Sequence, residues 1–374
     1  MQIYLDNNAA TPVDQRVLAA FTEAAAAPGN PQSSEHASGR AGQAQLEVAS
    51  FRVAELVDAS PGQVTFLPGA TAALTLVIDT CHRDLHPGSV VAGAADHSAV
   101  LNRLRSSTRK DASCRLAPVD EQGHLRLDAY KEMIHAQETR LVCLLAANNE
   151  VGTIEDLTEA CRIAEAAGAM VMVDACQAAG KIPLSFRELR CDYLVLSGAK
   201  LYGLPRTAAV ISRYDVSEAA KSRFGSPDAP GCASLGEACR LRAVEMNTDE
   251  PRIAKLRDRL EAQLRSAFPE MRVNGDPSSR LAGTLNFAVP GVLNDAVLAR
   301  VDGRLSLSTG AACHSGAHGP SHVLRAMQAP DWVLEGALRI GVGKFNTEEQ
   351  IEEAGTILVS AIKDARSARF RRSA

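Results

Sequence analysis

The sequence lacks a strong excess of positive charge. Its 374 residues carry a formal net charge of −4, and the one basic cluster is the tail Arg366, Arg369, Arg371 and Arg372. Proteins that bind nucleic acid need a basic patch or groove to attract the phosphate backbone. We therefore expect no direct nucleic acid partner, and we interpret the tail as a solvated chain end.

Long hydrophobic runs are also absent. No stretch reaches the roughly 18 consecutive apolar residues that indicate a membrane-spanning helix. The opening MQIYLDNNAATP contains neither the basic region nor the apolar region of a secretory signal. We therefore expect no membrane contact and a cytoplasmic location.

The cysteines show no close pair of the kind that binds a metal. Nine are scattered at positions 81, 114, 143, 161, 176, 191, 232, 239 and 313. Most of them are expected to be small buried side chains in a reducing compartment. His314, His318 and His322 follow Cys313, but their spacing does not resemble a closed metal site, so we predict none.

Short apolar runs alternate with amphipathic stretches between about Val64 and Arg213. The runs are VTFL, SVVAG, LVCLLA, MVMVD, YLVLS and AAVIS, with helices expected from Gly69 and over Leu157 to Ala167. Alternating strand and helix units predict an α/β fold, with a mostly parallel sheet covered by helices.

The pattern changes after Arg213. Ser222 to Gly236 is rich in Gly, Pro and Ser and is predicted to be a loop. A helix is expected over Glu237 to Phe268, followed by GTLNFAV, LSLSTGAAC, ALRIGVG and a final helix opening at 346–349. We predict a large domain of residues 15–250 and a smaller α+β domain, formed by residues 1–14 and 251–374, that carries the Cys313 loop.

Polar residues follow the predicted strands. Because ligands of such sheets bind at the carboxyl ends of the strands, these residues are the first candidates for a site. They are Gly69-Ala70-Thr71, Asp96-His97, Asn148-Asn149-Glu150, Asp174, Gln177 and Ser197 to Lys200. The first triplet lies at a strand-to-helix turn, where backbone N–H groups suit a phosphate, although a plain turn is the alternative.

Three of these side chains could act on a cofactor. Asp174 closes a buried strand and could pair with a pyridinium N–H, or could be a helix cap or ion pair. His97 could stack on a flat ring or transfer a proton, or it could be structural. Lys200 ends an apolar run, where burial favours the reactive amine that forms a Schiff base.

Cys313 lies among small residues in LSTGAACHSGAHGP, which suggests an accessible loop. A thiol there could attack a substrate, carry sulfur or simply oxidise.

The order of these motifs resembles that of the class V, fold-type I pyridoxal phosphate enzymes, and specifically the cysteine desulfurases of the NifS and IscS kind. The resemblance covers nearly the whole chain. It runs through YLDNNAATPVD, GNPQSSEHASGR, PGATAAL, DHSAV, ANNEVGT, VDACQAAGK, SGAKLYG, STGAACHS and LRIGVGKF. Nine motifs in the family's order are far more specific than any one of them.

The resemblance implies how pyridoxal phosphate is held. Lys200 would bind it covalently, Asp174 would pair with its ring nitrogen, and His97 would stack over its ring. The other implied contacts are Gln177 at the phenolic oxygen, Ala70, Thr71 and Ser197 at the phosphate, and Asn149 near the cofactor.

The resemblance also implies the reaction. Asn149 and Arg339 resemble the pair that holds the carboxylate of L-cysteine, and a guanidinium fork suits that group. Cys313 matches the nucleophile that takes the substrate sulfur as a persulfide, releases alanine and passes the sulfur to an acceptor protein. A homodimer is expected as well. Because GAACHS is also similar to selenocysteine lyases, selenocysteine stays open as a substrate.

Two regions depart from the family pattern. Ala199 stands where the family has a histidine that contacts the cofactor phosphate, and LPRTAAV replaces the usual glycine-rich continuation. Ser222 to Gly236 also lacks the Arg-x-Gly-Thr-like motif whose threonine reaches the phosphate in the neighbouring subunit. Losing one hydrogen bond to a charged group lowers affinity by about one or two orders of magnitude. A non-catalytic paralogue with weakened cofactor binding is therefore the further alternative.

Overall fold

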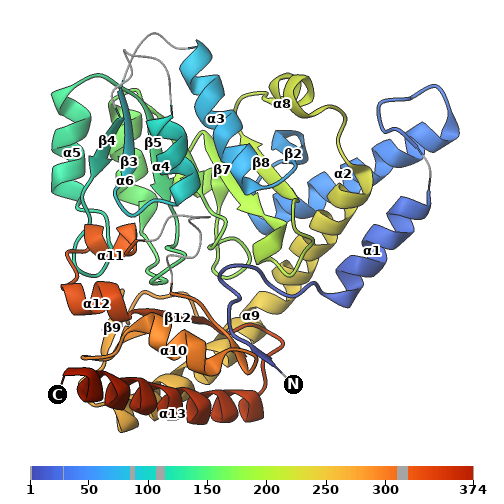
Figure 1. The fold of residues 1–374 in the computed structure, drawn as a ribbon. Helices are drawn as coiled ribbons and strands as arrows, with labels where there is room; N and C mark the ends of the chain where they lie inside the picture. Colours follow the sequence, from blue (N-terminus) through green and yellow to red (C-terminus); the bar gives the residue numbers. More distant parts are fainter. Residues whose placement is uncertain (1, 28, 85–88, 107–113, 310–318, 374) are drawn as a thin grey trace.

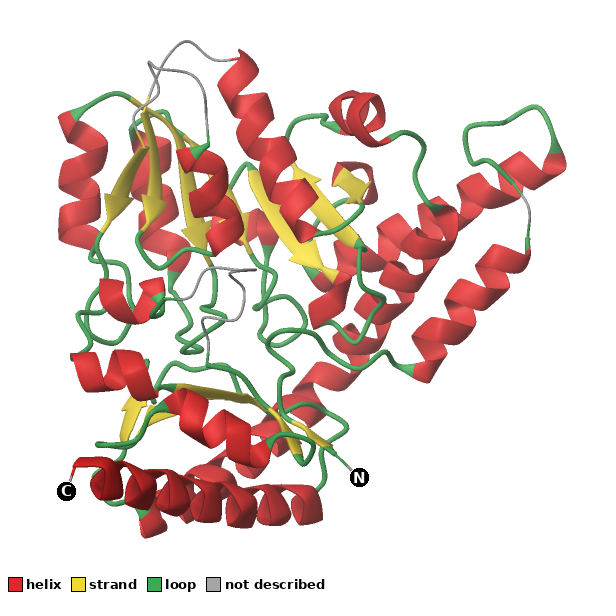
Figure 2. Ribbon diagram, in the orientation of Figure 1, coloured by secondary structure: helices red, strands yellow, loops and turns green. Residues whose placement is uncertain are grey.

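The computed structural model describes residues 2–27, 29–84, 89–106, 114–309 and 319–373. Its main element is a seven-stranded sheet with the strand order β2-β8-β7-β6-β5-β3-β4 (Figures 1 and 2). Strands β7, β6, β5, β3 and β4 are parallel, whereas β8 runs antiparallel to both of its neighbours. The prediction of an α/β fold with a mostly parallel sheet is confirmed. The strands are β2 (Val64–Leu67), β3 (Ser89–Gly93), β4 (Cys114–Ala117), β5 (Thr139–Leu145), β6 (Met170–Asp174), β7 (Tyr193–Ser197) and β8 (Ala208–Ser212).

Helices cover both faces of this sheet, which explains why its central strands are continuously apolar. Every residue of β7 and β8 is buried. One face packs against α3 (Ala70–Asp84) and α4 (Ser98–Arg105). The other packs against α5 (Leu127–Ala136), α6 (Leu157–Ala166), α7 (Phe186–Leu189) and part of α9 (Ala229–Ala267).

The helix α9 corrects the predicted loop over Ser222 to Gly236. Residues 217–224 form α8 (Ser217–Phe224), and α9 already begins at Ala229, so only residues 225–228 connect the two helices. Proline is tolerated in the first turn of a helix, and Pro230 lies there. A Cβ on Gly236 would lie only 2.7 Å from the Cα of Ala49 in α2 (Ala37–Leu56), so its small size serves close helix packing.

A second, smaller sheet lies beside the C-terminal half of α9. It consists of β9 (Arg272–Asn274), β10 (Thr284–Ala288) and β12 (Leu338–Gly341) in the antiparallel order β12-β10-β9. The hydrophobic core around this sheet includes Leu260 of α9, Phe287 of β10 and Leu358 of α13 (Glu348–Ser373). Ile3, near the N-terminus, belongs to the same core. The predicted domain boundary at residue 250 falls inside α9 and stays a prediction.

The remaining elements are short or peripheral. They are β1 (Ile3–Tyr4), β11 (Leu305–Ser306), α1 (Gln15–Ala26), α10 (Asn294–Val301), α11 (His322–Ala326), α12 (Asp331–Gly336) and the 3-10 turns η1 (Pro61–Gln63) and η2 (Gly198–Lys200). Strand β1 pairs in parallel with β11, which joins the N-terminus to the small lobe. Across the described ranges, no helix combines the length and apolar character needed to cross a membrane.

A buried ion-pair cluster holds α9 against the turn that follows β6. Arg242 is 1% exposed, and its guanidinium lies 2.6 Å from both Asp249 and Glu250. Its Nε also donates to the carbonyl of Gly180 at 2.8 Å. Removing the cation would leave two partly buried carboxylates without their main partner.

We therefore expect Arg242→Ala to lower the free energy of unfolding by about 3–5 kcal/mol. The matched control is Arg240→Ala, whose half-exposed side chain pairs with Glu237 on the same helix and whose loss should cost about 0–1 kcal/mol. Urea unfolding of both variants measures the difference. Equal effects would contradict a special role for the buried cluster.

Candidate active site

A cavity of about 390 Å³ lies at the carboxyl ends of β6 and β7. Most of the polar clusters expected at this edge meet there. The predicted site residues that line it are Ala70, Thr71, His97, Asn149, Asp174, Gln177, Ser197 and Lys200. Asp96, Asn148 and Glu150 belong to the same clusters but do not line this cavity. The structure thus gathers eight predicted residues, while their roles stay predictions.

Lys200 is held by the segment that follows β1. Its Nζ donates to the carbonyl of Asn8 at 2.9 Å and to that of Ala9. The same segment closes on the η2 turn through Thr11, whose backbone N–H donates to the carbonyl of Ala199 at 2.9 Å and whose Oγ1 accepts from Tyr202 N at 2.8 Å. The amine therefore has a fixed position at the cavity wall.

Asp174 and Gln177 lie on the same wall, in the turn that ends β6. Asp174 is 5% exposed, and its Oδ1 accepts a hydrogen bond from the backbone N–H of Cys176 at 3.0 Å. Gln177 donates through Nε2 to the carbonyl of Asn8 and accepts at Oε1 from Lys181 Nζ, at 2.9 and 2.7 Å. These bonds fix which end of the Gln177 amide is the donor. Burial lowers the pKa of Lys181 to about 7.

His97 caps the helix α4. Its Nδ1 accepts a hydrogen bond from the backbone N–H of Ala99 at 3.1 Å. A ring nitrogen that accepts carries no proton, so the neutral ring has its proton on Nε2. The ring is half-buried and lines the cavity.

The part of the cavity wall around the start of α3 has the character of an anion site. Gly69 has a φ of +117°, which glycine adopts without strain, and α3 begins directly after it at Ala70. The first N–H groups of a helix have no partner within the helix and attract negative charge. Ser197 adds a hydroxyl, whereas Ala199 lines the cavity with a methyl group only.

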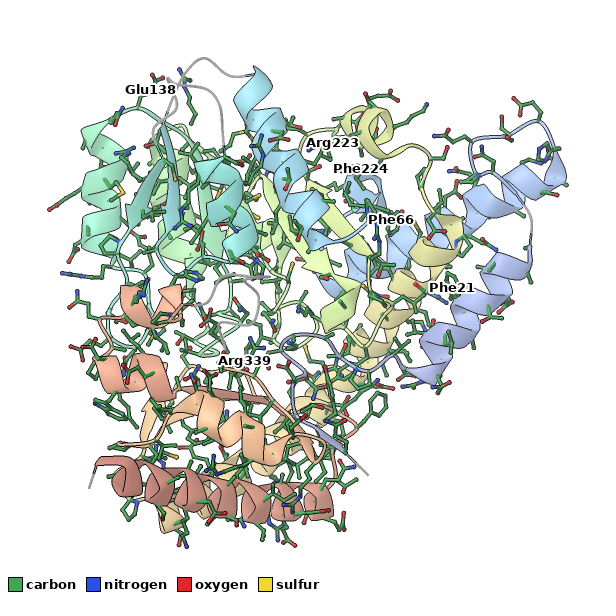
Figure 3. The ribbon with its side chains drawn as sticks, viewed as in Figure 1. Phe21, Phe66, Glu138, Arg223, Phe224 and Arg339 are labelled. Atoms are coloured by element: carbon green, nitrogen blue, oxygen red, sulfur yellow. The ribbon has the colours of Figure 1, made fainter. Side chains whose placement is uncertain are left out.

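Arg339 does not line the cavity. It is fully buried in β12, between the large sheet and the small lobe (Figure 3). Its guanidinium lies 2.8 Å from Asp6 Oδ1 and donates to the carbonyl of Asn149 at 3.1 Å. Among the described atoms its Nε has no hydrogen-bond partner. Arg339 therefore contacts Asn149, which lines the cavity, from the side that faces away from it.

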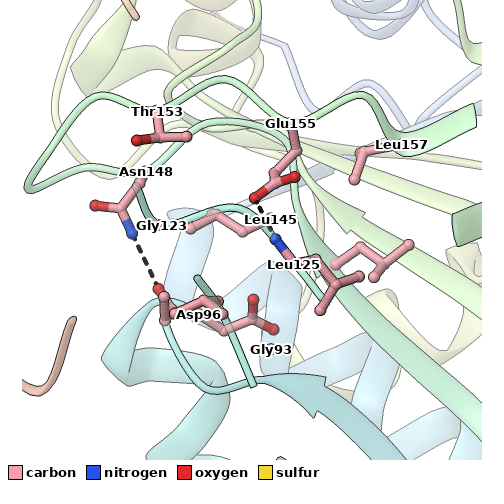
Figure 4. Close-up of a pocket in the computed structure, with 12 residues that line it drawn as sticks. Gly93, Asp96, Gly123, Leu125, Leu145, Asn148, Thr153, Glu155 and Leu157 are labelled. Carbon is pink, nitrogen blue, oxygen red and sulfur yellow. Dashed lines mark hydrogen bonds between the residues drawn. The ribbon is translucent and has the colours of Figure 1, made fainter. Parts of the chain in front are cut away.

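Asp96 lies beside a second, much smaller cavity of about 30 Å³ (Figure 4). Asn148 donates to the carbonyl of Ala95 there at 3.1 Å, and Glu155 accepts from Leu125 N at 3.0 Å. Burial raises the pKa of Asp96 well above its ordinary value. This carboxyl is separated from the main cavity, so we regard it as structural.

Cys313 lies outside the described residues, as do His314 and His318. His322 is described, and its Nε2 lies 2.9 Å from the carbonyl oxygen of Asp96. The predicted sulfur-carrying loop thus stays a prediction.

Sequence reasoning missed three residues of this region. Asn8 and Lys181 both lie in motifs that carried the resemblance, YLDNNAATPVD and VDACQAAGK, and could have been found there. Arg206, which lines the cavity, lies in LPRTAAV, where the chain departs from the family pattern.

The fold is that of a class V aminotransferase. The aminotransferase class-V family model matches residues 3–223 and 216–353, and the chain belongs to this family. Its relatives include the cysteine desulfurase of Mus musculus, 32% identical over 97% of this chain and 82% of the relative. Cysteine desulfurase IscS of Ehrlichia chaffeensis is 30% identical over 98% of this chain and 92% of the relative. The resemblance drawn from the nine motifs is confirmed.

Solved structures agree. A NifS-like protein superposes with a TM-score of 0.88 at 27% identity, over 97% of this chain and all of its own. A NifS-like protein from Rickettsia africae has a TM-score of 0.86 at 24% identity, over 98% of this chain and 100% of its own, and shows the fold alone.

Glu150 provides a pH-dependent test of this region. It is 2% exposed, accepts from Ser321 Oγ, and has His322 Nδ1 at 4.0 Å. Burial raises its pKa from 4.5 to about 7. Between pH 4.5 and about 7 the folded protein keeps a proton on Glu150 that the unfolded chain has lost. The free energy of unfolding therefore falls as the pH rises through this range.

We predict that Glu150→Gln removes this fall in stability, because glutamine still accepts a hydrogen bond from Ser321 but does not ionise. Between pH 5 and 8 the free energy of unfolding of the variant should rise relative to the parent, by up to roughly 3 kcal/mol. Urea unfolding at each pH measures the change, and Glu353→Gln at an exposed site is the control. A constant difference across the pH range would refute the raised pKa.

Proposed function

We propose that this chain is a cysteine desulfurase. It takes the sulfur of L-cysteine onto the Cys313 thiol as a persulfide, releases L-alanine and delivers the sulfur to an acceptor protein. In this transfer the C–S bond of cysteine breaks, an S–S bond forms at Cys313, and a proton replaces the sulfur on the substrate carbon. The observation that carries the proposal is the meeting of Lys200, Asp174 and His97 in one cavity, in a chain with cysteine desulfurases among its relatives.

Pyridoxal phosphate is the proposed cofactor, and the donor set of the cavity fits it. A buried carboxylate, Asp174, suits the ring N–H; an amine, Lys200, suits the aldehyde; the donor end of the Gln177 amide suits the phenolic oxygen. The start of α3 with Ala70 and Thr71, together with Ser197, suits the phosphate. When bound, this cofactor supplies an electron sink that lets the C–S bond break.

The side chains around the cavity have distinct proposed tasks. His97 would lie against the cofactor ring and would move a proton through Nε2, because Nδ1 accepts a hydrogen bond from Ala99 N. Asn149 and Arg339 hold the substrate carboxylate. Arg339 Nε has no hydrogen-bond partner among the described residues. The ion-pair partner of Arg339, Asp6, can be replaced by another carboxylate. Lys200 is the other base, held ready by the carbonyls of Asn8 and Ala9.

A homodimer is also proposed. Large apolar side chains are exposed on α1 and α2, at Leu18 (41%), Val48 (51%) and Phe51 (58%). Phe224 of α8 is 36% exposed and lines a cavity of about 920 Å³ together with Leu18. Such a surface is typical of a protein interface. A cytoplasmic location is proposed because the eight described cysteines form no disulfide among themselves, as expected in a reducing compartment.

Two alternatives remain. The stretch GAACHS favours selenocysteine as a competing substrate, which a competition between cysteine and selenocysteine would reveal. Ala199, without a side-chain donor, favours a non-catalytic protein with weak cofactor binding.

The binding of the cofactor by Lys200 is tested by absorption spectroscopy. On addition of pyridoxal phosphate, the parent should develop a visible band that changes when L-cysteine is added, because the amine bonds to the cofactor aldehyde. Lys200→Ala should lack the band. The control is Lys255→Ala, a lysine that does not line the cavity. A parent without any band at saturating cofactor would favour the non-catalytic alternative.

The role of Cys313 is tested by measuring sulfide release. Cys313→Ser should bind the cofactor as the parent does but release no sulfide from L-cysteine in the presence of a thiol reductant, because a hydroxyl does not carry the sulfur. Cys114→Ser at an exposed cysteine is the control. Sulfide release by Cys313→Ser at the parent rate would exclude the persulfide route.

A further inference from the structure

One charged residue of the cavity has no assigned task. Besides His97, the charged side chains on its wall with a proposed role are Asp174 and Lys200. The remaining one is Arg206. The two assigned groups belong to the ring and the aldehyde of the proposed cofactor, which leaves the phosphate without a cationic partner.

The backbone places Arg206 at the phosphate end. A Cβ on Gly69 would lie 3.7 Å from the Cα of Arg206, so this residue lies next to the turn that begins α3. Its loop is fixed to the η2 turn, because Gly198 N donates to the carbonyl of Thr207 at 2.9 Å and Thr207 Oγ1 donates to that of Leu204 at 2.8 Å. Arg206 is therefore held beside the helix start rather than placed at random on the surface.

The conformation of Arg206 is uncommon. Its φ is +64°, in the left-handed region that glycine adopts readily and that costs energy for a residue with a side chain. Residues in such conformations concentrate at functional sites. An arginine kept at a place that favours glycine suggests that its side chain is needed.

The guanidinium of Arg206 is unpaired within the described residues, where no hydrogen bond or ion pair engages it. By contrast, Arg103 and Arg223 on nearby helices are both paired with Asp79. Arg206 is exposed and also lines a larger cavity of about 920 Å³, so it stands on the rim that the two cavities share. A planar fork of N–H donors on this rim suits a phosphate.

We propose that Arg206 binds the phosphate of the cofactor and supplies the donor that Ala199 lacks. This inference rests on the proposed function. Arg206 acts together with the N–H groups at the start of α3 and with Ser197, and its charge offsets part of the phosphate charge. It is a binding residue and takes no part in bond breaking.

The experiment compares pyridoxal phosphate with pyridoxal, which lacks the phosphate. Both are titrated by absorption into the parent, Arg206→Gly, Arg206→Lys and the control Arg213→Ala, whose exposed side chain lies outside the cavity. Glycine suits the left-handed backbone, so Arg206→Gly should fold at least as well as the parent. Thermal unfolding without cofactor checks this.

In Arg206→Gly the affinity for pyridoxal phosphate should fall about 10-fold or more, while that for pyridoxal stays unchanged. Arg206→Lys should lie in between, and Arg213→Ala should match the parent. Ala199→His in the Arg206→Gly background should restore part of the lost affinity, because the histidine ring supplies a hydrogen-bond donor for the phosphate.

Unchanged affinities for both ligands in Arg206→Gly would overturn the proposal, and so would an equal loss of affinity for both. In either case the proposed function survives, because the parent still binds the cofactor. A parent that binds neither ligand would overturn the proposed cofactor, and the role of Arg206 with it.

Discussion

The contacts of Asn8 connect the parts of this molecule on which the site depends. Its carbonyl oxygen accepts hydrogen bonds from both Lys200 and Gln177, each at 2.9 Å. Its side-chain amide donates to the carbonyl of Asn149 at 3.2 Å and to Thr284 Oγ1 at 2.8 Å. One residue near the N-terminus thus fixes two side chains in the turns after β6 and β7 and ties them to β10 of the small lobe. A displacement of this segment would disturb the proposed cofactor site and the lobe contact together.

A second buried network supports the same wall from behind. Lys181 donates to Gln177, and burial lowers its pKa, whereas burial raises the pKa of Glu250. Arg242 pairs with Glu250 and also holds the carbonyl of Gly180, next to Lys181. Because these groups are buried and linked, the orientation of the Gln177 amide depends on α9 as well as on its own turn.

The sequence predicted the fold where burial dictates the pattern. Strands β6, β7 and β8 were found because both of their faces are covered, which makes all but their last residues largely apolar. The strand β4, CRLA, was missed because it is an edge strand with two exposed residues. The helix start at Ala229 was missed because glycine and proline usually indicate a loop, whereas here they serve the first helical turn and close packing on α2.

The site was predictable because its side chains follow parallel strands, so position in the chain gives position at the sheet edge. That reasoning extended to Asp174, Gln177 and Lys200. It did not extend to Arg206, because its place beside Gly69 depends on β8 running antiparallel to β2, so that β8 begins where β2 ends and α3 starts. Nor did it extend to the partner of Arg339, because Asp6 and Arg339 are 333 residues apart in the chain.

The pairing of Arg339 with Asp6 bears on how a substrate carboxylate is selected. Arg339 is fully buried, so its charge needs an anionic partner at all times. A ligand carboxylate can take the place of Asp6, whose side chain is 19% exposed and can turn to water. A neutral ligand would leave the buried guanidinium uncompensated. In the proposed role of Arg339, selectivity for an amino acid therefore arises from an exchange of one carboxylate for another, with little change in buried charge.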